Sequence, residues 1–181
     1  MADLLSLDLV KKNLVTNQLV LTIGYDIDNL TNEEINSNYD GPIVKDFYGR
    51  NVPKPAHGTI NIDHYTSSSI TLVENITKLY DKIINRNLLI KRINITANNV
   101  INKEDSEKHK NYEQIDLFTN YKMVEEKRTK EKAREQDENK LQHVLIDIKN
   151  KYGKNAILKG MNLEEGATTI DRNRQIGGHH E

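Results

Sequence analysis

Hydrophobic and polar positions in the first hundred residues follow two periods, one typical of helices and one typical of strands. Leucines and valines spaced three or four apart predict an amphipathic helix over residues 3–15. Residues 18–25 then alternate between large apolar and small or polar side chains, which predicts a half-buried strand. The expected core-facing residues are Leu4, Leu7, Val10 and Leu14 in the helix and Leu19, Leu21, Ile23 and Tyr25 in the strand.

Further elements follow a long turn-rich segment. Residues 26–57 contain Asn-Ser-Asn-Tyr-Asp-Gly-Pro and two more prolines, which predicts a long loop or an excursion at a hairpin. Alternation predicts strands over residues 59–65 and 89–100. Between these strands, serines at 67–69 are candidate N-caps of a helix with the apolar stripe Val73, Ile76, Tyr80, Ile83 and Ile84. The order helix, strand, strand, helix, strand predicts an α+β fold, an antiparallel sheet with two helices on one face.

The other face of this sheet is expected to be polar. It would carry hydroxyl and amide side chains with one cation, namely Thr22, Thr59, Asn61, Arg92, Asn94 and Thr96. One interpretation is the solvated face of an ordinary antiparallel sheet. The other is a surface that lies against a phosphate backbone and positions it without reading its sequence.

Charge separates the two halves of the chain. Residues 1–100 carry 10 Lys or Arg and 11 Asp or Glu, whereas the shorter segment 101–181 carries 16 of each. The polar run 102–111 is expected to be a linker. Residues 125–140 then predict a charged helix surrounded by solvent. Residues 141–152 carry the apolar stripe Leu141, Val144, Leu145, Ile148 and Tyr152, and Gly153 is placed to end this helix.

The apolar stripe over residues 141–152 needs a partner surface. Three surfaces could cover it: the first domain of the same chain, a second copy in a homodimer, or an upstream part of a longer protein. Beyond the helix, Arg172 and Arg174 belong to a tail that is expected to be flexible, and that either touches phosphate or is disordered.

Several classes of protein are excluded by composition. The chain has 181 residues and no Cys, which excludes disulfides and thiolate chemistry and suits the cytoplasm. No apolar run is long enough to span a membrane. The 6 His lack paired ligand spacing, so no zinc site is expected. Asp26 and Asp28 stand where a strand runs into a polar loop, so we do not expect a catalytic metal site there, and no cofactor is expected on this chain.

Residues 45–63 and 90–96 carry a family resemblance. The segment Ile90-Lys91-Arg92-Ile93-Asn94-Ile95-Thr96 resembles the last strand of the little-finger domain of Y-family translesion DNA polymerases. This resemblance implies that Lys91 and Arg92 grip the DNA backbone. The element order is also similar to the β-α-β-β-α-β order of the little finger, except that no strand precedes the first helix. The family's first strand is therefore expected outside this sequence or elsewhere in it, and a sheet edge would be exposed.

A second resemblance concerns five consecutive residues, Gln114, Ile115, Asp116, Leu117 and Phe118. They resemble the peptide with which bacterial polymerases bind the sliding clamp. In such a peptide the Gln amide forms hydrogen bonds while Leu and Phe are buried in an apolar pocket. The alternative is a short element that packs Leu117 and Phe118 onto the core of this protein.

Residues 151–157 and 168–179 resemble the tail of the UmuC-type branch of the family in Gram-positive bacteria. The three resemblances together imply a little-finger domain over 1–101, a linker with the clamp peptide over 102–120, and a helical arm with a flexible tail over 121–181. The implied partners are duplex primer–template DNA and the sliding clamp, in DNA-damage repair. The palm domain and its Mg²⁺ would belong to another part of the parent polymerase. The alternative is a self-associating protein-interaction module that works through its helical arm, which the net charge of −1 favours.

Overall fold

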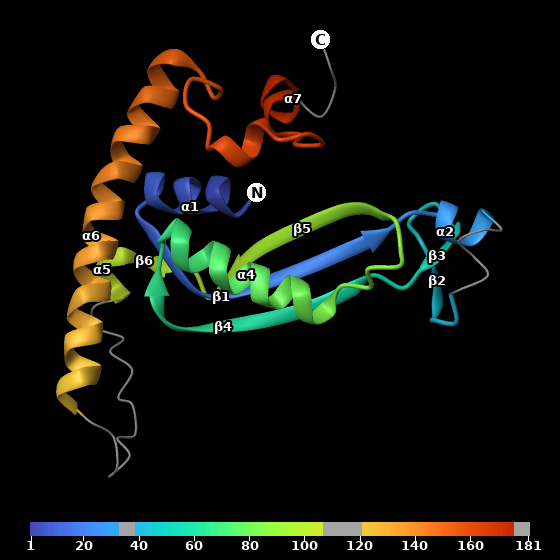
Figure 1. The fold of residues 1–181 in the computed structure, drawn as a ribbon, viewed down its shortest axis with the longest axis horizontal. Coiled ribbons are helices and arrows are strands. Elements are labelled where there is room, and N and C mark those ends of the chain that lie inside the picture. Colours follow the sequence, from blue (N-terminus) through green and yellow to red (C-terminus); the bar gives the residue numbers. More distant parts are fainter. Residues whose placement is uncertain (33–38, 107–120, 176–181) are drawn as a thin grey trace. The chain divides into compact units, whose positions relative to one another are not determined.

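The computed structural model describes residues 1–32, 39–106 and 121–175 (Figure 1). The chain divides into two compact units, residues 1–116 and 117–181. The elements of the first unit are α1 (Ala2–Lys11), β1 (Leu14–Tyr25), α2 (Asp28–Thr31), β2 (Ile43–Lys45), β3 (Asn51–Pro53), β4 (Ala56–Thr66), α4 (Ser69–Ile83), β5 (Ile90–Asn98), β6 (Ile101–Asn102) and α5 (Lys103–Ser106). Those of the second are α6 (Tyr121–Tyr152), the 3-10 helix η1 (Gly160–Leu163) and α7 (Thr169–Arg174).

The first unit is built on an antiparallel sheet with β1 at its centre. Strand β1 pairs with β4 on one side and with β5 on the other, and its first two residues pair with β6. Helices α1 and α4 pack against each other and against the sheet, so both cover the same face (Figure 1). The predicted α+β class, with an antiparallel sheet and helices on one face, is confirmed.

The core lies between the sheet and these helices. Leu19, Leu21 and Ile23 of β1 are at most 1% exposed, which confirms the alternation expected for this strand. Helix α4 begins where the serines predicted it, because Ser68 Oγ accepts a hydrogen bond from the Thr71 N–H at 3.2 Å. The buried residues of α4 are Leu72, Ile76 and Leu79, and the predicted Val73, Tyr80, Ile83 and Ile84 pack around them.

The prediction for the first helix is wrong in its length and in its buried face. Helix α1 ends at Lys11, Asn13 takes a positive φ of 53°, and Leu14 already belongs to β1. Leu4 is 44% exposed, whereas Ser6 is buried and its Oγ donates to the Ser67 carbonyl at 2.7 Å. A polar side chain therefore occupies the contact between α1 and the start of α4, and the hydrophobic pattern does not reveal such a residue.

The long segment between β1 and β4 is a hairpin excursion, one of the two predicted alternatives. Strands β2 and β3 form an antiparallel ribbon in which Val44 is paired with Val52. Helix α2 precedes this ribbon and lies against β3. The ribbon leads directly into β4, because only Lys54 and Pro55 separate β3 from Ala56.

The predicted linker begins too early. Asn102 is paired with Leu14, and the Lys103 N–H donates to the Asn13 carbonyl at 3.0 Å. Residues 101–106 therefore belong to the first unit rather than to a linker. The first unit extends past β5 because β1 begins four residues before the predicted strand start. The additional backbone groups of β1 form hydrogen bonds with the segment that follows β5.

In the second unit, the helix predicted over residues 125–152 is confirmed. Helix α6 has 32 residues and ends at Tyr152, where Gly153 takes a φ of 97° and its N–H donates to the Lys149 carbonyl at 3.0 Å. In the tail, residues 160–163 form a 3-10 helix and residues 169–174 form an α-helix. Asn155 joins these segments: its Nδ2 donates to the Ile170 carbonyl and its Oδ1 accepts from Asn173 Nδ2.

Candidate nucleic-acid interface

The face of the sheet opposite the helices is a surface of neutral polar groups. The register places its residues in cross-strand rows, because alternate residues of adjacent antiparallel strands share a face. Val20 is flanked by Thr59 and Thr96, and Thr22 is flanked by His57 and Asn94. The sheet thus brings together the predicted residues Thr22, Thr59, Asn61, Arg92, Asn94 and Thr96. We call these rows, with Gln18, Gly24, His57 and Asn98, the open face.

An amide ladder forms one end of the open face. Gln18 is paired with Asn61 on β4 and with Asn98 on β5. Gln18 Nε2 donates to Asn61 Oδ1 at 2.8 Å, and Asn98 Nδ2 donates to Gln18 Oε1 at 3.1 Å. These bonds hold the three amides in one line across the sheet. They leave the Asn61 Nδ2 donor and the Asn98 Oδ1 acceptor for an external partner.

The middle rows of the open face hold free hydrogen-bonding groups. Thr59, Asn94 and Thr96 are exposed, and their side chains form no hydrogen bond with any residue that the structure describes. Thr22 Oγ1 lies 3.0 Å from His57 Nδ1, within hydrogen-bonding distance. Hydroxyl and amide groups of this kind are common partners of phosphate and sugar oxygens.

Arg92 forms the other end of the open face. It is paired with Gly24, and a Cβ at position 24 would lie 3.0 Å from Arg92 Cγ and 3.3 Å from its Nε. The missing side chain therefore lets the arginine lie across the central strand. Arg92 is exposed and forms no ion pair with the described part of the chain. Its guanidinium keeps five N–H donors and a full positive charge for an anion.

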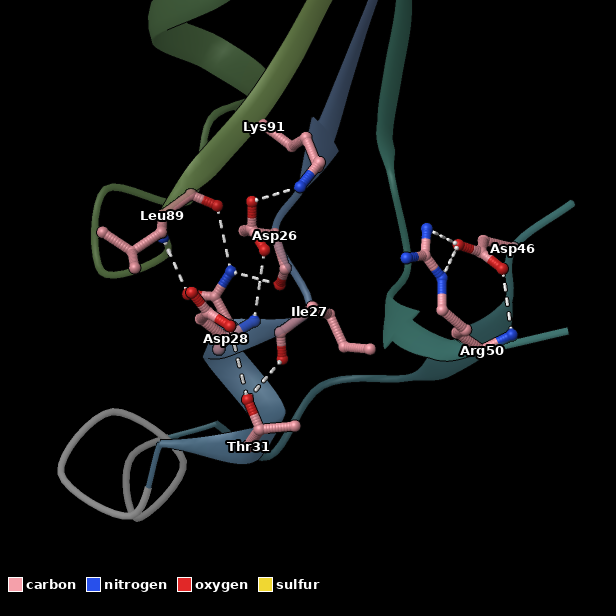
Figure 2. Close-up of polar contacts among 9 residues, drawn as sticks. Asp26, Ile27, Asp28, Thr31, Asp46, Arg50, Leu89 and Lys91 are labelled. Atoms are coloured by element: carbon pink, nitrogen blue, oxygen red, sulfur yellow. Dashed lines mark hydrogen bonds and ion pairs between the residues drawn. The ribbon is translucent and has the colours of Figure 1, made fainter. Parts of the chain in front are cut away.

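Lys91, predicted to act with Arg92, has a different neighbour. The register shifts between Gly24 and Tyr25, and Lys91 is the extra residue that this irregularity introduces into β5. Its Nζ lies 2.9 Å from Asp26 Oδ2, as Figure 2 shows. The hydrogen bond from Lys91 lowers the pKa of the Asp26 carboxyl below its usual value, and the Asp28 N–H adds to the effect. The two adjacent cations are thus not equivalent, because only Arg92 is without a carboxylate partner.

The loop around Asp26 is held by a buried amide. Asn29 is fully buried, and its Nδ2 donates to the carbonyls of Asp26 and Leu89 at 2.8 and 2.9 Å. Its Oδ1 accepts the Leu89 N–H at 2.7 Å. These bonds tie the end of β1 to the start of β5, and so fix the backbone that presents Lys91 and Arg92.

The carboxylates of Asp26 and Asp28 contact neighbouring protein groups. Asp26 accepts from Lys91 and from the Asp28 N–H, and Asp28 Oδ1 lies 3.5 Å from Thr31 Oγ1. Across the described residues, no group of three or more His, Asp or Glu side chains is arranged to hold a metal ion. No helix in the described ranges has the length and apolar character needed to cross a membrane.

The predicted site residues and the observed ones differ at the clamp peptide and on the open face. The clamp-binding candidates Gln114, Ile115, Asp116, Leu117 and Phe118 lie outside the described residues. Gln18, His57 and Asn98 were missed as members of the open face. Their signal was present in the alternation that selects Thr22, Thr59 and Thr96. Gln18 and Asn98 lie within the predicted strands, and His57 is reached because β4 begins at Ala56 rather than at residue 59.

Comparisons with known proteins identify no relative. No protein-family model matches the chain, and searches of curated proteins and of solved structures found no significant similarity to either.

Proposed function

We propose that this chain is the DNA-binding and clamp-tethering region of an error-prone translesion DNA polymerase of the Y family. In this proposal the first unit holds duplex primer–template DNA on its open face. The peptide Gln114–Phe118 binds the sliding clamp, and a catalytic palm in another part of the polymerase adds nucleotides. The protein would act in DNA-damage repair in the bacterial cytoplasm.

The open face is the observation that carries the DNA-binding part. Its paired rows contain hydroxyls, amides, one imidazole and Arg92, and no Asp or Glu. Rows from Arg92 to Asn98 cover six residue steps, or roughly 20 Å at about 3.3 Å per residue. Such a surface suits a sugar–phosphate backbone, since its paired rows offer donors and one cation. The exposed Asp63 follows Asn61 on β4 beyond the last paired row of the open face, at the end opposite Arg92. It would position DNA rather than select a sequence.

The clamp-tethering part is supported by the residues of the peptide and by its place in the chain. The peptide follows the last described residues of the first unit and precedes α6. A tether at this point raises the local concentration of the open face near DNA that the clamp encircles. Weak backbone binding by a nearly neutral domain is then sufficient for function.

Salt-dependent DNA binding tests the open face. We expect Arg92→Ala to weaken binding of a labelled primer–template duplex, and to reduce the slope of log affinity against log salt by about 0.9. Arg92→Lys should keep the slope, because it keeps the charge. Arg86→Ala is the matched control, since Arg86 is paired with Asp81 at 2.8 Å and lies off the open face. Fluorescence anisotropy at several salt concentrations gives the slopes, and equal slopes for Arg92→Ala and Arg86→Ala would contradict the proposal.

Calorimetry with purified sliding clamp tests the peptide. We expect Leu117→Ala and Phe118→Ala each to cost roughly 2 kcal/mol of binding free energy, as buried anchors do, and Gln114→Ala to cost less. Leu163→Ala is a suitable control because Leu163 is a 68% exposed leucine elsewhere in the second unit. If the double variant Leu117→Ala, Phe118→Ala binds the clamp with unchanged affinity, residues 114–118 are not the clamp-binding peptide.

A second candidate function is self-association through α6. Leu141, Val144 and Tyr152 are 58%, 52% and 66% exposed, so the structure leaves much of the predicted apolar stripe uncovered. Exposed apolar residues at helical spacing favour helix–helix association. This function does not exclude the first, and its test is given in the Discussion.

A further inference from the structure

Two aromatic rings stand in solvent at the tip of the β2–β3 hairpin. Phe47 is 96% exposed and Tyr48 is 77% exposed, although Phe is found at only 2 positions in the chain. Their ring centroids are 5.5 Å apart and their planes make an angle of 87°, so the edge of one ring meets the face of the other. Rings that are exposed to this degree add nothing to the core and leave most of their surface open to a partner.

The tip is held in one conformation by the Asp46 carboxylate. Asp46 Oδ1 accepts the N–H groups of Tyr48 and Arg50, both at 2.9 Å. Asp46 Oδ2 accepts from Arg50 Nε at 2.9 Å and from Arg50 Nη2 at 2.7 Å, as Figure 2 shows. Gly49 completes the turn with a φ of 77°. The backbone that carries the rings is therefore ordered by folding, which reduces the entropy that a binding partner would have to remove.

Three cationic side chains belong to this segment, namely Lys45, Arg50 and Lys54, and Arg50 is the one that lies over a ring. The Arg50 guanidinium carbon lies 5.1 Å from the centroid of Tyr48. Lys45 on β2 and Lys54 after β3 are both exposed, and neither is paired with a carboxylate among the described residues. Aromatic rings between cations are the arrangement with which proteins hold single-stranded nucleic acid, because bases stack on the rings while the cations attract the backbone.

The hairpin leaves the sheet at the end where Arg92 lies. Ala56, three residues after the end of β3, is paired with Ile23, and the next residue of β1, Gly24, is paired with Arg92. Strand β3 also lies against β1. The aromatic tip is thus attached to the Arg92 end of the open face, not to its amide-ladder end.

We propose that the tip, Phe47 with Tyr48, is a stacking platform for an unpaired nucleobase of DNA whose duplex part lies on the open face. The inference rests on the proposed DNA-binding function and adds to it a second, single-stranded contact. Its ligand is the first unpaired part of a template strand beyond the duplex. Stacking is tolerant of sequence because every base has a flat π-face.

A protein partner is a less suitable occupant for this tip. Binding hot spots are surrounded by apolar contacts that exclude water. Here the residues next to the rings are Lys45, Asp46, Gly49 and Arg50, and none of them extends an apolar surface. The flanking cations suit a polyanion better than an apolar pocket.

The experiment compares two DNA substrates of equal duplex length, one blunt and one with a single-stranded template overhang. For the double variant Phe47→Ala, Tyr48→Ala we expect affinity for the overhang substrate to fall roughly tenfold, with little change for the blunt duplex. Phe47→Leu, Tyr48→Leu should lose as much, since leucine is apolar but offers no ring. In the wild type, 5-iodouracil in the overhang should photocrosslink to Phe47 or Tyr48, mapped by mass spectrometry.

Leu163→Ala is the control. Leu163 is also a large apolar side chain that is mostly exposed, at 68%, but it belongs to the second unit and lies outside the stripe proposed for self-association. The stacking proposal would be overturned by any of three results. The alanine variant could lose equal affinity for blunt and overhang DNA, the leucine variant could keep full affinity for overhang DNA, or the crosslinks could map outside the hairpin. If Arg92→Ala still lowers the salt slope in that case, DNA binding on the open face stands and only the platform fails. If the wild type binds neither substrate, both proposals fail.

Discussion

Single polar residues hold the first unit together at the end of the sheet where Arg92 lies. Asn29 is buried and satisfied by three backbone groups, and Asp46 orders a whole turn through four donors. At the other end of β1, Thr16 is fully buried, and its hydroxyl hydrogen bonds to the Asn98 carbonyl beside the shift in register. Each of these side chains supplies hydrogen bonds to backbone groups that the irregular parts of the sheet leave unpaired.

Asp26 provides a prediction at the same scale. The pKa of its carboxyl is lowered mainly by the hydrogen bond from Lys91, so Lys91→Ala should raise that pKa toward 3.8. A carboxyl whose pKa is lower in the folded than in the unfolded state stabilises the fold above the unfolded pKa. That stabilisation is lost as the pH falls through the folded pKa. The variant should therefore lose less stability than the wild type between neutral and acidic pH. A carbon-detected NMR titration of Asp26 measures the shift, and an identical titration curve in the variant would show that the ion pair is not formed.

Among the elements, the contact between α4 and β4 depends on the absence of a side chain. Gly58 faces the helix, and a Cβ at this position would lie 2.9 Å from Leu79 Cδ1 and 3.0 Å from Ile83 Cγ2. The strand can approach α4 closely only because position 58 has no Cβ. The open face on the other side of β4 has no such restriction.

We therefore expect Gly58→Val to destabilise the first unit by about 1–3 kcal/mol, the range typical of overpacking. Thr59→Val is the matched control. It places the same side chain on the neighbouring, exposed position and should change stability by no more than about 0.5 kcal/mol. Hydrogen exchange of the β1 amides reports the stability of this unit independently of α6. Equal protection in both variants would show that the helix adjusts without cost.

At the scale of the whole molecule, two units of different character share one chain. The first is a sheet with a polar open face, and the second contains a helix of 32 residues, about 48 Å long at about 1.5 Å per residue. Under the proposed function, the first unit contacts DNA, and the clamp peptide and α6 contact protein partners.

For the second unit we expect a concentration-dependent homodimer through residues 141–152. Leu141→Asp with Val144→Asp should produce a monomer, because two exposed apolar positions on one helical face become charged. The far-UV circular dichroism should be unchanged, since neither side chain is buried. Arg134→Asp, on the charged part of α6, should leave the dimer intact. Analytical ultracentrifugation decides the question, and a wild type that sediments as a monomer at all concentrations would remove the self-association function.

How much the sequence determined depends on whether a feature is local. Alternation along β1 and β5 predicted Leu19, Leu21 and Ile23 inside and Thr22, Asn94 and Thr96 outside, because a strand places successive side chains on opposite faces wherever it lies. The N-cap at Ser68 and the helix end at Gly153 were also readable, since caps depend on a few neighbouring residues. The α+β class followed from the order of these elements.

The tertiary structure alone decided the features that depend on residues distant in sequence. Pairing in register showed that Gln18, Asn61 and Asn98 form one ladder and that Arg92 lies beside Gly24. The tertiary structure also gives Lys91 and Arg92 different neighbours through an irregularity in β5. In α1 it buries Ser6, whereas periodicity predicted a different buried face for this helix. It also showed Phe47 and Tyr48 as exposed rings, although aromatic residues are usually taken as core. Register, close approach and exposure are set by which strands and helices meet, and no local pattern in the chain contains that information.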